Sequence, residues 1–468
     1  MSASPKRALL LAPYFLPRRR VGAMRPFRFV LHLRDFGWRP TVLTIAAKGQ
    51  QLTAKEARLL DEVEIIRLHP PFDRSTSAES QLRPSSGGSP PDDRSGAAGL
   101  ARKKIEAWGE RLLEGFDRQF PVDTWLPFFL LKYRRLAQVV RRVRPHVMWS
   151  TGDPWSGPVM GAHLARRFGV PHVADLRDPW TLSPVRGQKK VLRAVDRWCE
   201  RRVLRTSRAV VFTARQTEAA YRRHYAALDL QTTTIYNSFD RTLFDDPVGN
   251  DENARGAPAS SKTTLDGPLD IGFFGRFRAL SPAAPIADAL AAARRRHGAG
   301  MTGAIRVFSF GPLGKADARY ARRLGVRGQF HRREAVPLEE ALAGLRRFDL
   351  LLLSTAPRRS EIVPAKLWEY LAAGRPVLSL STNPEVARLL DQTGTGVQIA
   401  PGRSEAIADL LADCVEARRA GRTFPVPFTP DANAIKQFEA RAATRRLADV
   451  FDRAAATPTP ERPLPSSP

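Results

Sequence analysis

Short apolar runs alternate with amphipathic segments along most of this chain, and the alternation stops once and then starts again. Apolar runs separated by helical patterns predict parallel strands whose crossover helices cover both faces of a sheet. Strands are expected at 7–13, 41–45, 64–68, 146–151, 172–176, 209–213 and 233–236, and after the interruption at 270–274, 305–310, 329–332, 350–354, 377–380 and 396–399. Helices are expected between them, for example at 25–36 and 159–168. The sequence therefore predicts an α/β protein with two doubly wound, Rossmann-like domains.

The interruption at 245–268 is rich in Asp, Gly, Ala, Ser and Pro, which is typical of a linker. With 468 residues the chain has room for two domains with sizeable cores. We expect a first domain at 1–244, a second at 269–429 and a C-terminal helix at 430–455. The segments 73–100 and 456–468 have few large apolar side chains, so we expect them to be disordered.

The chain carries 75 basic and 47 acidic residues, which gives a net charge of +28. Such an excess favours an anionic partner: a phosphorylated substrate, an anionic membrane surface or nucleic acid. The arginines are scattered and no recognised nucleic-acid-binding module accompanies them, so no specific nucleic-acid binding is expected. A coding bias toward Arg is the alternative explanation of the charge.

The cysteines and the first residues of the chain indicate in which cellular compartment the protein resides. Cys199 and Cys414 are the only cysteines, and two distant cysteines make neither a disulfide framework nor a zinc site. The apolar run 8–12 is short and lacks a cleavage pattern, so we interpret it as a strand rather than a signal peptide. No apolar run approaches the ~20 residues of a membrane span. We expect a cytoplasmic protein, with a peripheral position on the inner membrane face as the alternative.

The segment from 349 to 380 predicts a strand, a loop, a helix and a second strand. Pro364 suits the first position of that helix and Gly374 suits its C-terminal end. A helix N-terminus at the carboxyl end of a parallel strand binds anions. Glu361 and Glu369, with seven residues between them, add carboxylates that accept hydrogen bonds from hydroxyl groups. Phosphate recognition beside hydroxyl recognition indicates a nucleotide-sugar; the alternative is that both carboxylates are solvated.

Residues 361–377 resemble the donor-site signature of retaining GT-B glycosyltransferases of family 4. The matching positions are Glu361, Pro364, Lys366, Glu369, Tyr370, Ala373, Gly374 and Pro376. The resemblance implies that Glu361 contacts the donor sugar and that Glu369 holds the nucleotide ribose. It also implies the GT-B architecture, in which two Rossmann-like domains face each other across a cleft and a C-terminal helix returns to the first domain. Such enzymes generally need no divalent metal at the sugar site, so no metal and no cofactor are expected.

The second domain opens with a strand followed by Gly275 and Arg276. A guanidinium at a strand end suits a pyrophosphate, because Arg binds phosphate oxygens in a bidentate way. The resembling family carries an Arg here and usually a Lys a few residues later, whereas the segment 279–282 contains no Lys. Arg278 is the candidate substitute, and an exposed Arg without function is the alternative. Donor binding is expected to include Gly275, Arg276, Arg278, Pro364, Ala365, Lys366 and Glu369.

Two loops of the first domain are candidates for the acceptor side. Residues 177–181 resemble the Arg-Asp-Pro-Trp-Thr loop of a subgroup of these transferases, which makes Asp178 a candidate to orient the sugar or the acceptor. The alternative is an Asx turn at Asp178. Gly22 and Arg25 lie where the family places a glycine-containing turn against the acceptor, and basic neighbours there suit a phosphate-linked lipid. A solvated basic loop is the alternative.

A basic amphipathic pattern occupies 101–116, with Ile105, Trp108, Leu112 and Phe116 at helical spacing. This pattern favours a helix packed on its own domain, and a helix lying on an anionic membrane is the alternative.

Together these features predict a retaining, metal-independent glycosyltransferase with Glu361, Asp178 and Arg276 at the reaction centre. Its expected partners are a nucleotide-sugar donor and a glycan or lipid-linked acceptor. Two other functions stay open: a non-catalytic protein of the same fold that binds an anionic polymer or lipid, and a nucleotide-sugar epimerase. The missing Lys favours the first, and the scarcity of His argues against the second.

Overall fold

The computed structural model describes residues 5–18, 20–47, 49–70, 120–184, 190–243, 267–311, 313–333, 338–359 and 361–456. The expected helix at 101–116, the insertion at 73–100, the tail beyond 456 and nearly all of the expected linker lie outside the described residues. The chain divides into two compact units, an N-terminal unit of Met1–Ser238 with Ala440–Pro468 and a C-terminal unit of Phe239–Glu439. Each unit is described by itself below.

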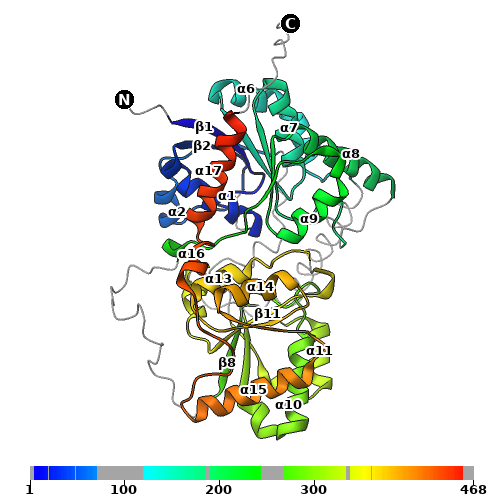
Figure 1. The fold of residues 1–468 in the computed structure, drawn as a ribbon, viewed down its shortest axis with the longest axis vertical. Helices are drawn as coiled ribbons and strands as arrows, with labels where there is room; N and C mark the ends of the chain where they lie inside the picture. Colours follow the sequence, from blue (N-terminus) through cyan, green and yellow to red (C-terminus); the bar gives the residue numbers. More distant parts are fainter. Residues whose placement is uncertain are drawn as a thin grey trace, which may run out of the picture. The chain divides into compact units, whose positions relative to one another are not determined.

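The N-terminal unit is built on a seven-stranded sheet in the order β3-β2-β1-β4-β5-β6-β7, and every pairing in it is parallel. Its strands are β1 (Lys6–Leu11), β2 (Trp38–Ile45), β3 (Glu64–Leu68), β4 (Val147–Gly152), β5 (His172–Leu176), β6 (Ala209–Phe212) and β7 (Thr232–Thr234). Its helices are α1 (Val21–His32), η1 (Leu33–Phe36), α2 (Ala54–Leu59), α5 (Leu126–Leu131), α6 (Tyr133–Val143), α7 (Ser156–Phe168), α8 (Lys190–Thr206), α9 (Arg215–His224), η2 (Ala226–Leu228) and α17 (Ala440–Ala456). The strand order reverses between β1 and β4, and helices lie on both faces of the sheet (Figure 1).

The end of the chain contributes to the N-terminal unit. The segment expected as one helix from 430 breaks into α16 (Ala432–Lys436), which belongs to the C-terminal unit, and α17. The Phe451 ring packs edge-on against Trp38 at 5.3 Å between centroids. Asp452 forms an ion pair with Lys6 at 2.8 Å. Residues from both ends of the sequence therefore share one core.

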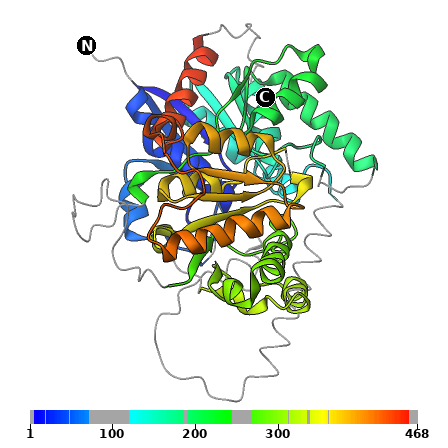
Figure 2. The same ribbon diagram turned by 60° about the horizontal axis from the view of Figure 1, so that its bottom comes forward.

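The C-terminal unit is built on a six-stranded parallel sheet in the order β10-β9-β8-β11-β12-β13. Its strands are β8 (Leu269–Phe273), β9 (Ile305–Ser309), β10 (Phe330–Arg332), β11 (Leu350–Ser354), β12 (Val377–Leu380) and β13 (Gly396–Ile399). Its helices are η3 (Arg241–Leu243), α10 (Ala284–Gly303), α11 (Lys315–Arg323), η5 (Arg327–Gln329), α12 (Leu338–Leu345), η6 (Pro357–Arg359), α13 (Lys366–Ala373), α14 (Pro384–Thr393), α15 (Ser404–Arg419) and α16. α10 and α15 lie side by side in the unit (Figure 2).

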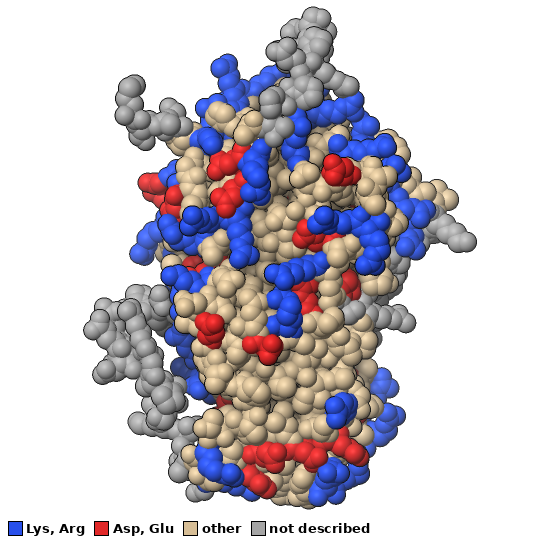
Figure 3. Space-filling view, in the orientation of Figure 1, with Lys and Arg blue, Asp and Glu red and all other residues tan. Residues whose placement is uncertain are grey.

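All of the strands expected from the sequence are present, and β3, β5, β11, β12 and β13 have the expected bounds. The doubly wound α/β architecture of both units is confirmed. Cys199 and Cys414 are buried and unbridged. No helix among the described residues is both long and apolar enough to cross a bilayer. Lys and Arg are dispersed over the visible face of both units, as their scatter in the sequence suggests (Figure 3).

Candidate functional site

Three segments of the C-terminal unit converge where strands of its sheet end. They follow β8, β9 and β11, whose carboxyl ends lie at the same edge because the strands are parallel and adjacent. The Ser354 hydroxyl donates to the carbonyl of Pro282 at 2.7 Å, and the backbone N–H of Ala356 donates to the carbonyl of Leu280 at 3.2 Å. These bonds fasten the loop after β8 to the end of β11.

Tyr370 on α13 links the loop after β8 to β11 through hydrogen bonds. Its buried hydroxyl accepts from the backbone N–H of Phe274 and donates to the carbonyl of Leu352, both at 2.9 Å. One side chain thus joins α13, β11 and the first residue after β8. The sequence motif included this tyrosine, but its positioning role needs the structure to be seen.

Lys366 is the first residue of α13, and its ammonium lies 3.7 Å from the centroid of the Phe273 ring. Burial, together with the charge of Arg278, lowers the pKa of Lys366 to about 7. Gly275 has a φ of +106°, and a Cβ there would lie 3.6 Å from Cε of Lys366. The glycine is therefore required by its left-handed backbone, since a Cβ would make only an ordinary van der Waals contact with the lysine.

Three arginines join Lys366 at this edge. Burial lowers the pKa of the Arg278 guanidinium, and the charges of Arg359 and Arg276 act in the same direction. A Cβ on Gly311, just after β9, would lie 3.2 Å from Cβ of Arg276, which places Arg276 between the ends of β8 and β9. Like charges held this close raise the energy of the site.

The two predicted carboxylates flank the start of α13. Glu369 is buried in the first turn of the helix, and Glu361 is half-buried in the loop before it, with Oε1 4.0 Å from Nε of Arg359. The expected helix start at Pro364 is wrong: α13 begins at Lys366, after Ala365 as N-cap. The Pro364 carbonyl instead accepts from the N–H of Leu367 at 3.0 Å, so a single turn leads into the helix.

Asn383, which was not singled out from the sequence, fixes the loop that carries Glu361. Its Nδ2 donates to the carbonyl of Ile362 at 2.8 Å, while its Oδ1 accepts from the N–H of Glu385 and caps α14. The dipeptide Asn-Pro at a helix start is the sequence signal that predicts the cap. The contact with Ile362 has no such signal.

In the N-terminal unit, Gly22 and Arg25 serve contacts inside the fold. A Cβ on Gly22 would lie 2.7 Å from a terminal nitrogen of Arg177, so the glycine makes room for that guanidinium. Arg25 is buried, forms an ion pair with Asp175 at 2.7 Å and donates to the carbonyl of Tyr236 at 2.9 Å. The acceptor-side role of both residues stays a prediction.

The loop that carries Asp178 is anchored by the residues that follow it. The Trp180 ring stacks on Trp155 at 5.0 Å with planes 1° apart, and Trp155 comes from the similar loop after β4. The N–H of Trp180 donates to the Tyr221 hydroxyl at 2.8 Å, and its indole N–H donates to Asp196 at 3.2 Å. Asp178 itself is half-buried at the strand end. Most of the motif is therefore structural, and Asp178 is its one candidate for chemistry.

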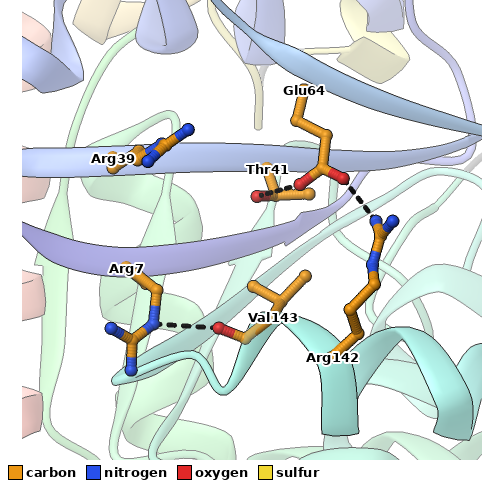
Figure 4. A pocket seen from close by; sticks show the side chains of 6 residues that line it. All are labelled: Arg7, Arg39, Thr41, Glu64, Arg142 and Val143. Carbon is orange, nitrogen blue, oxygen red and sulfur yellow. Dashed lines mark hydrogen bonds and ion pairs between the residues drawn. The ribbon is translucent and has the colours of Figure 1, made fainter.

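A separate cavity of about 280 Å³ lies at the amino ends of β1, β2 and β3 (Figure 4). Its lining consists of Arg7, Arg39, Thr41, Glu64, Arg142 and Val143. Glu64 accepts from Thr41 and pairs with Arg142, while Nε of Arg7 donates to the last carbonyls of α6. These contacts hold the sheet edge to α6, and we assign the cavity no ligand.

No group of three or more His, Cys, Asp or Glu side chains suited to hold a metal ion occurs among the described residues.

Comparison with known proteins connects the fold to a family. Residues 22–237 match the family model of the glycosyl transferase 4-like domain. The matched range lies within the N-terminal unit. No curated protein matches the chain in sequence. The matched range includes Gly22, Arg25 and Asp178, whereas the signature at 361–377 lies beyond it.

Solved structures extend the likeness to the whole chain. Sucrose-phosphate synthase of Thermosynechococcus elongatus superimposes with a TM-score of 0.58 at 14% identity, over 96% of this chain and 98% of that one. The α,α-trehalose-phosphate synthase (UDP-forming) of Burkholderia vietnamiensis gives 0.54 at 12% identity, over 97% and 99%. The E. coli trehalose-6-phosphate structure bound with UDP-2-fluoro glucose gives 0.57 at 10% identity, over 96% and 99%. At these identities the likeness shows the fold, and the expected GT-B glycosyltransferase fold is confirmed.

Proposed function

We propose that this protein transfers a sugar from a nucleotide-sugar to an acceptor hydroxyl, and that it binds the donor at the carboxyl edge of the C-terminal sheet. One observation carries the proposal: four cations and two carboxylates from three separate segments meet around the start of α13. The cations are Arg276, Arg278, Arg359 and Lys366, and the carboxylates are Glu361 and Glu369.

The cations suit the diphosphate of the donor. Arg276 and Arg278 project from the loop after β8, and guanidinium groups bind phosphate oxygens in a bidentate way. The first N–H groups of α13 add the positive end of a helix dipole. Both stabilise the negative charge that grows on the leaving nucleotide, so they act most strongly in the transition state.

Lys366 supplies the ammonium that the loop after Arg276 lacks. The family places a Lys a few residues after the Arg, and residues 279–282 contain none. Here the ammonium comes from α13 instead and lies against the Phe273 ring near Gly275. With a pKa of about 7, Lys366 is only partly protonated at neutral pH, and a bound diphosphate would favour its charged form.

The carboxylates suit the hydroxyl groups of the donor. We assign Glu369, buried in the first turn of α13, to the ribose, and Glu361, in the loop held by Asn383, to the sugar. Pro364 and Ala365 shape the backbone between them. Asp178 is assigned to the sugar or the acceptor, and Gly22 and Arg25 to the acceptor side.

Retention of configuration and independence of metal ions are part of the proposal. Retention rests on the resemblance of residues 361–377 to retaining family 4 enzymes. Metal independence rests on the four cations, which supply the charge that a divalent ion supplies elsewhere. The net charge of +28 supports a phosphate-bearing or lipid-linked acceptor.

The proposal is tested by thermal unfolding of the full chain with UDP, GDP, ADP, TDP and their common sugars. A ligand that binds only the folded state raises the midpoint, and at one hundred times its Kd it adds about 2.7 kcal/mol of stability. We expect one nucleotide to raise the midpoint of wild type and of Glu416→Ala, an exposed carboxylate on α15, but not of Glu369→Ala.

The other outcomes decide against the proposal. No shift with any nucleotide would favour a non-catalytic protein that binds anionic polymer or lipid. Release of a free sugar epimer, with no transfer to any acceptor, would favour the epimerase.

A further inference from the structure

The outward face of α8 carries large apolar side chains in water. Val191, Val195 and Trp198 are 75%, 39% and 63% exposed, and their spacing places them on one stripe of the helix. α8 lies at the outer side of the N-terminal unit (Figure 1). Only two other large apolar side chains among the described residues are exposed, Leu130 at 57% and Leu131 at 74%. All five therefore fall on α5 and α8, which random surface composition does not explain.

The charged residues of α8 are sorted by sign. Among the described side chains of α8, the exposed charged ones are arginines, at 193, 197, 201, 202 and 205. Its two acidic residues, Asp196 and Glu200, are each 1% exposed and point inward. Asp196 accepts from the N–H of Val122 at 2.6 Å, and Glu200 accepts from the Tyr225 hydroxyl at 2.5 Å. The outward face is thus apolar and cationic.

α7 connects this face to α5. It packs against both helices, and its exposed His163 meets the Tyr133 ring edge-on at 5.5 Å between centroids. Tyr133 follows Leu131 by two residues. α7 thus contacts both of the helices that carry the exposed apolar side chains. We call the surface formed by Leu130, Leu131, Val191, Val195, Trp198 and the exposed α8 arginines the α5–α8 face.

We propose that the α5–α8 face docks on an anionic lipid bilayer, with α8 lying in the plane of the interface. Trp and aliphatic side chains enter the boundary between headgroups and acyl chains, while arginines reach lipid phosphates. Arg202 already lies 5.6 Å from the Trp198 ring, which shields part of that ring until lipid replaces it. This inference is independent of the donor site, because none of its residues is assigned to sugar transfer.

Two other occupants fit the face less well. A second copy of the chain would bring the arginines of two α8 helices together, which charge repulsion opposes. A nucleic acid would use the arginines but leaves the five exposed apolar side chains unexplained.

The experiment is flotation of the full chain with two kinds of vesicle. One is phosphatidylcholine alone, and the other contains about 30% phosphatidylglycerol to resemble an anionic membrane. Binding to the anionic vesicles is expected to weaken at high salt. We expect Arg197→Gln with Arg201→Gln to weaken it about thirtyfold, since each arginine near the surface contributes about a factor of five. Val195→Ser with Trp198→Ser should weaken it at least as much.

Arg319→Gln with Arg322→Gln on α11 is the matched control, since it removes two exposed arginines from the C-terminal unit. It should leave vesicle binding unchanged. Equal loss in this control would show diffuse charge attraction and overturn the proposal, as would unchanged binding in both α8 variants. A fall from dimer to monomer in the α8 variants would assign the face to a second copy. Each variant should keep the nucleotide-dependent rise in unfolding midpoint, which separates this test from that of the proposed function.

Discussion

The two units differ in how their buried charges are paired. In the N-terminal unit, Arg25 is matched by Asp175, and Asp196 and Glu200 accept several hydrogen bonds from within the unit. In the C-terminal unit, cations lie close to other cations, and burial together with their mutual repulsion lowers the pKa values of Lys366 and Arg278. A buried charge that the fold itself neutralises is structural, whereas like charges gathered by separate loops indicate a ligand.

The largest effect on stability should come from breaking the ion pair between Arg25 and Asp175. Arg25→Ala leaves Asp175 buried without its cation, and we expect the free energy of unfolding to fall by about 3–5 kcal/mol. Urea denaturation measures this loss. Arg25→Leu with Asp175→Leu is the control and should recover much of the stability. Lost transfer in a variant whose stability falls by less than about 1 kcal/mol would show that Arg25 acts only on the acceptor side and not on stability.

Removing Arg276 from the cation cluster of the C-terminal unit should reduce activity rather than stability. Arg276→Ala is expected to lower kcat about 10²- to 10³-fold, because it removes charge that stabilises the leaving nucleotide. Stability should stay the same or rise slightly, since like-charge repulsion is relieved. Steady-state kinetics and thermal unfolding of the same samples measure both, with Arg322→Ala on α11 as the exposed control. An unchanged kcat would remove Arg276 from the site.

Removing the Tyr370 hydroxyl, which links α13 to β11 and to the loop after β8, should have a smaller effect on stability and affinity. Tyr370→Phe leaves the N–H of Phe274 and the carbonyl of Leu352 without their shared partner, at a cost of about 1–3 kcal/mol. Nucleotide affinity should fall as well, because the loop after β8 loses its anchor. Calorimetric titration and unfolding of the variant test this. Tyr320→Phe, at a partly exposed tyrosine of the same unit, should leave affinity unchanged; equal losses in both would contradict the positioning role.

Lys366 should give a pH dependence of stability that is spread over several pH units. The pKa of Lys366 is about 7 in the fold and has an ordinary value of 10.5, so between these values the unfolded chain binds more protons. The lysine therefore destabilises the fold below pH 7, and this cost disappears as the pH rises toward 10.5, at no more than about 1.4 kcal/mol per pH unit. Lys366→Met should remove that rise from the stability curve.

Proton uptake on nucleotide binding provides a second test of Lys366. A diphosphate raises the pKa of Lys366, so binding near pH 8 should take up protons, seen as a dependence of the binding enthalpy on the buffer. Lys366→Met should remove this dependence. Proton uptake that persists in the variant would assign it to another group.

The sequence predicted what depends on local pattern. The apolar runs marked the strands because a buried parallel strand needs apolar side chains on both faces. Pro364 marked the start of α13 to within two residues, and Gly374 marked its C-terminal cap. Contacts between residues distant in sequence could not be predicted. Nothing near Asn383 predicts its contact with Ile362, and nothing near Arg359 predicts its proximity to Arg278. The same limit explains why Gly22 and Arg25 were not linked to Arg177 and Asp175.

The position of α17 has a consequence for synthesis. The ribosome makes β1 and β2 first, yet the ring that packs on Trp38 belongs to Phe451, and the partner of Lys6 is Asp452. The N-terminal unit cannot complete its core until the whole C-terminal unit has been translated. The C-terminal unit, which is continuous in sequence, has no such wait. We therefore expect the second unit of the chain to finish folding first, against the usual N-to-C order.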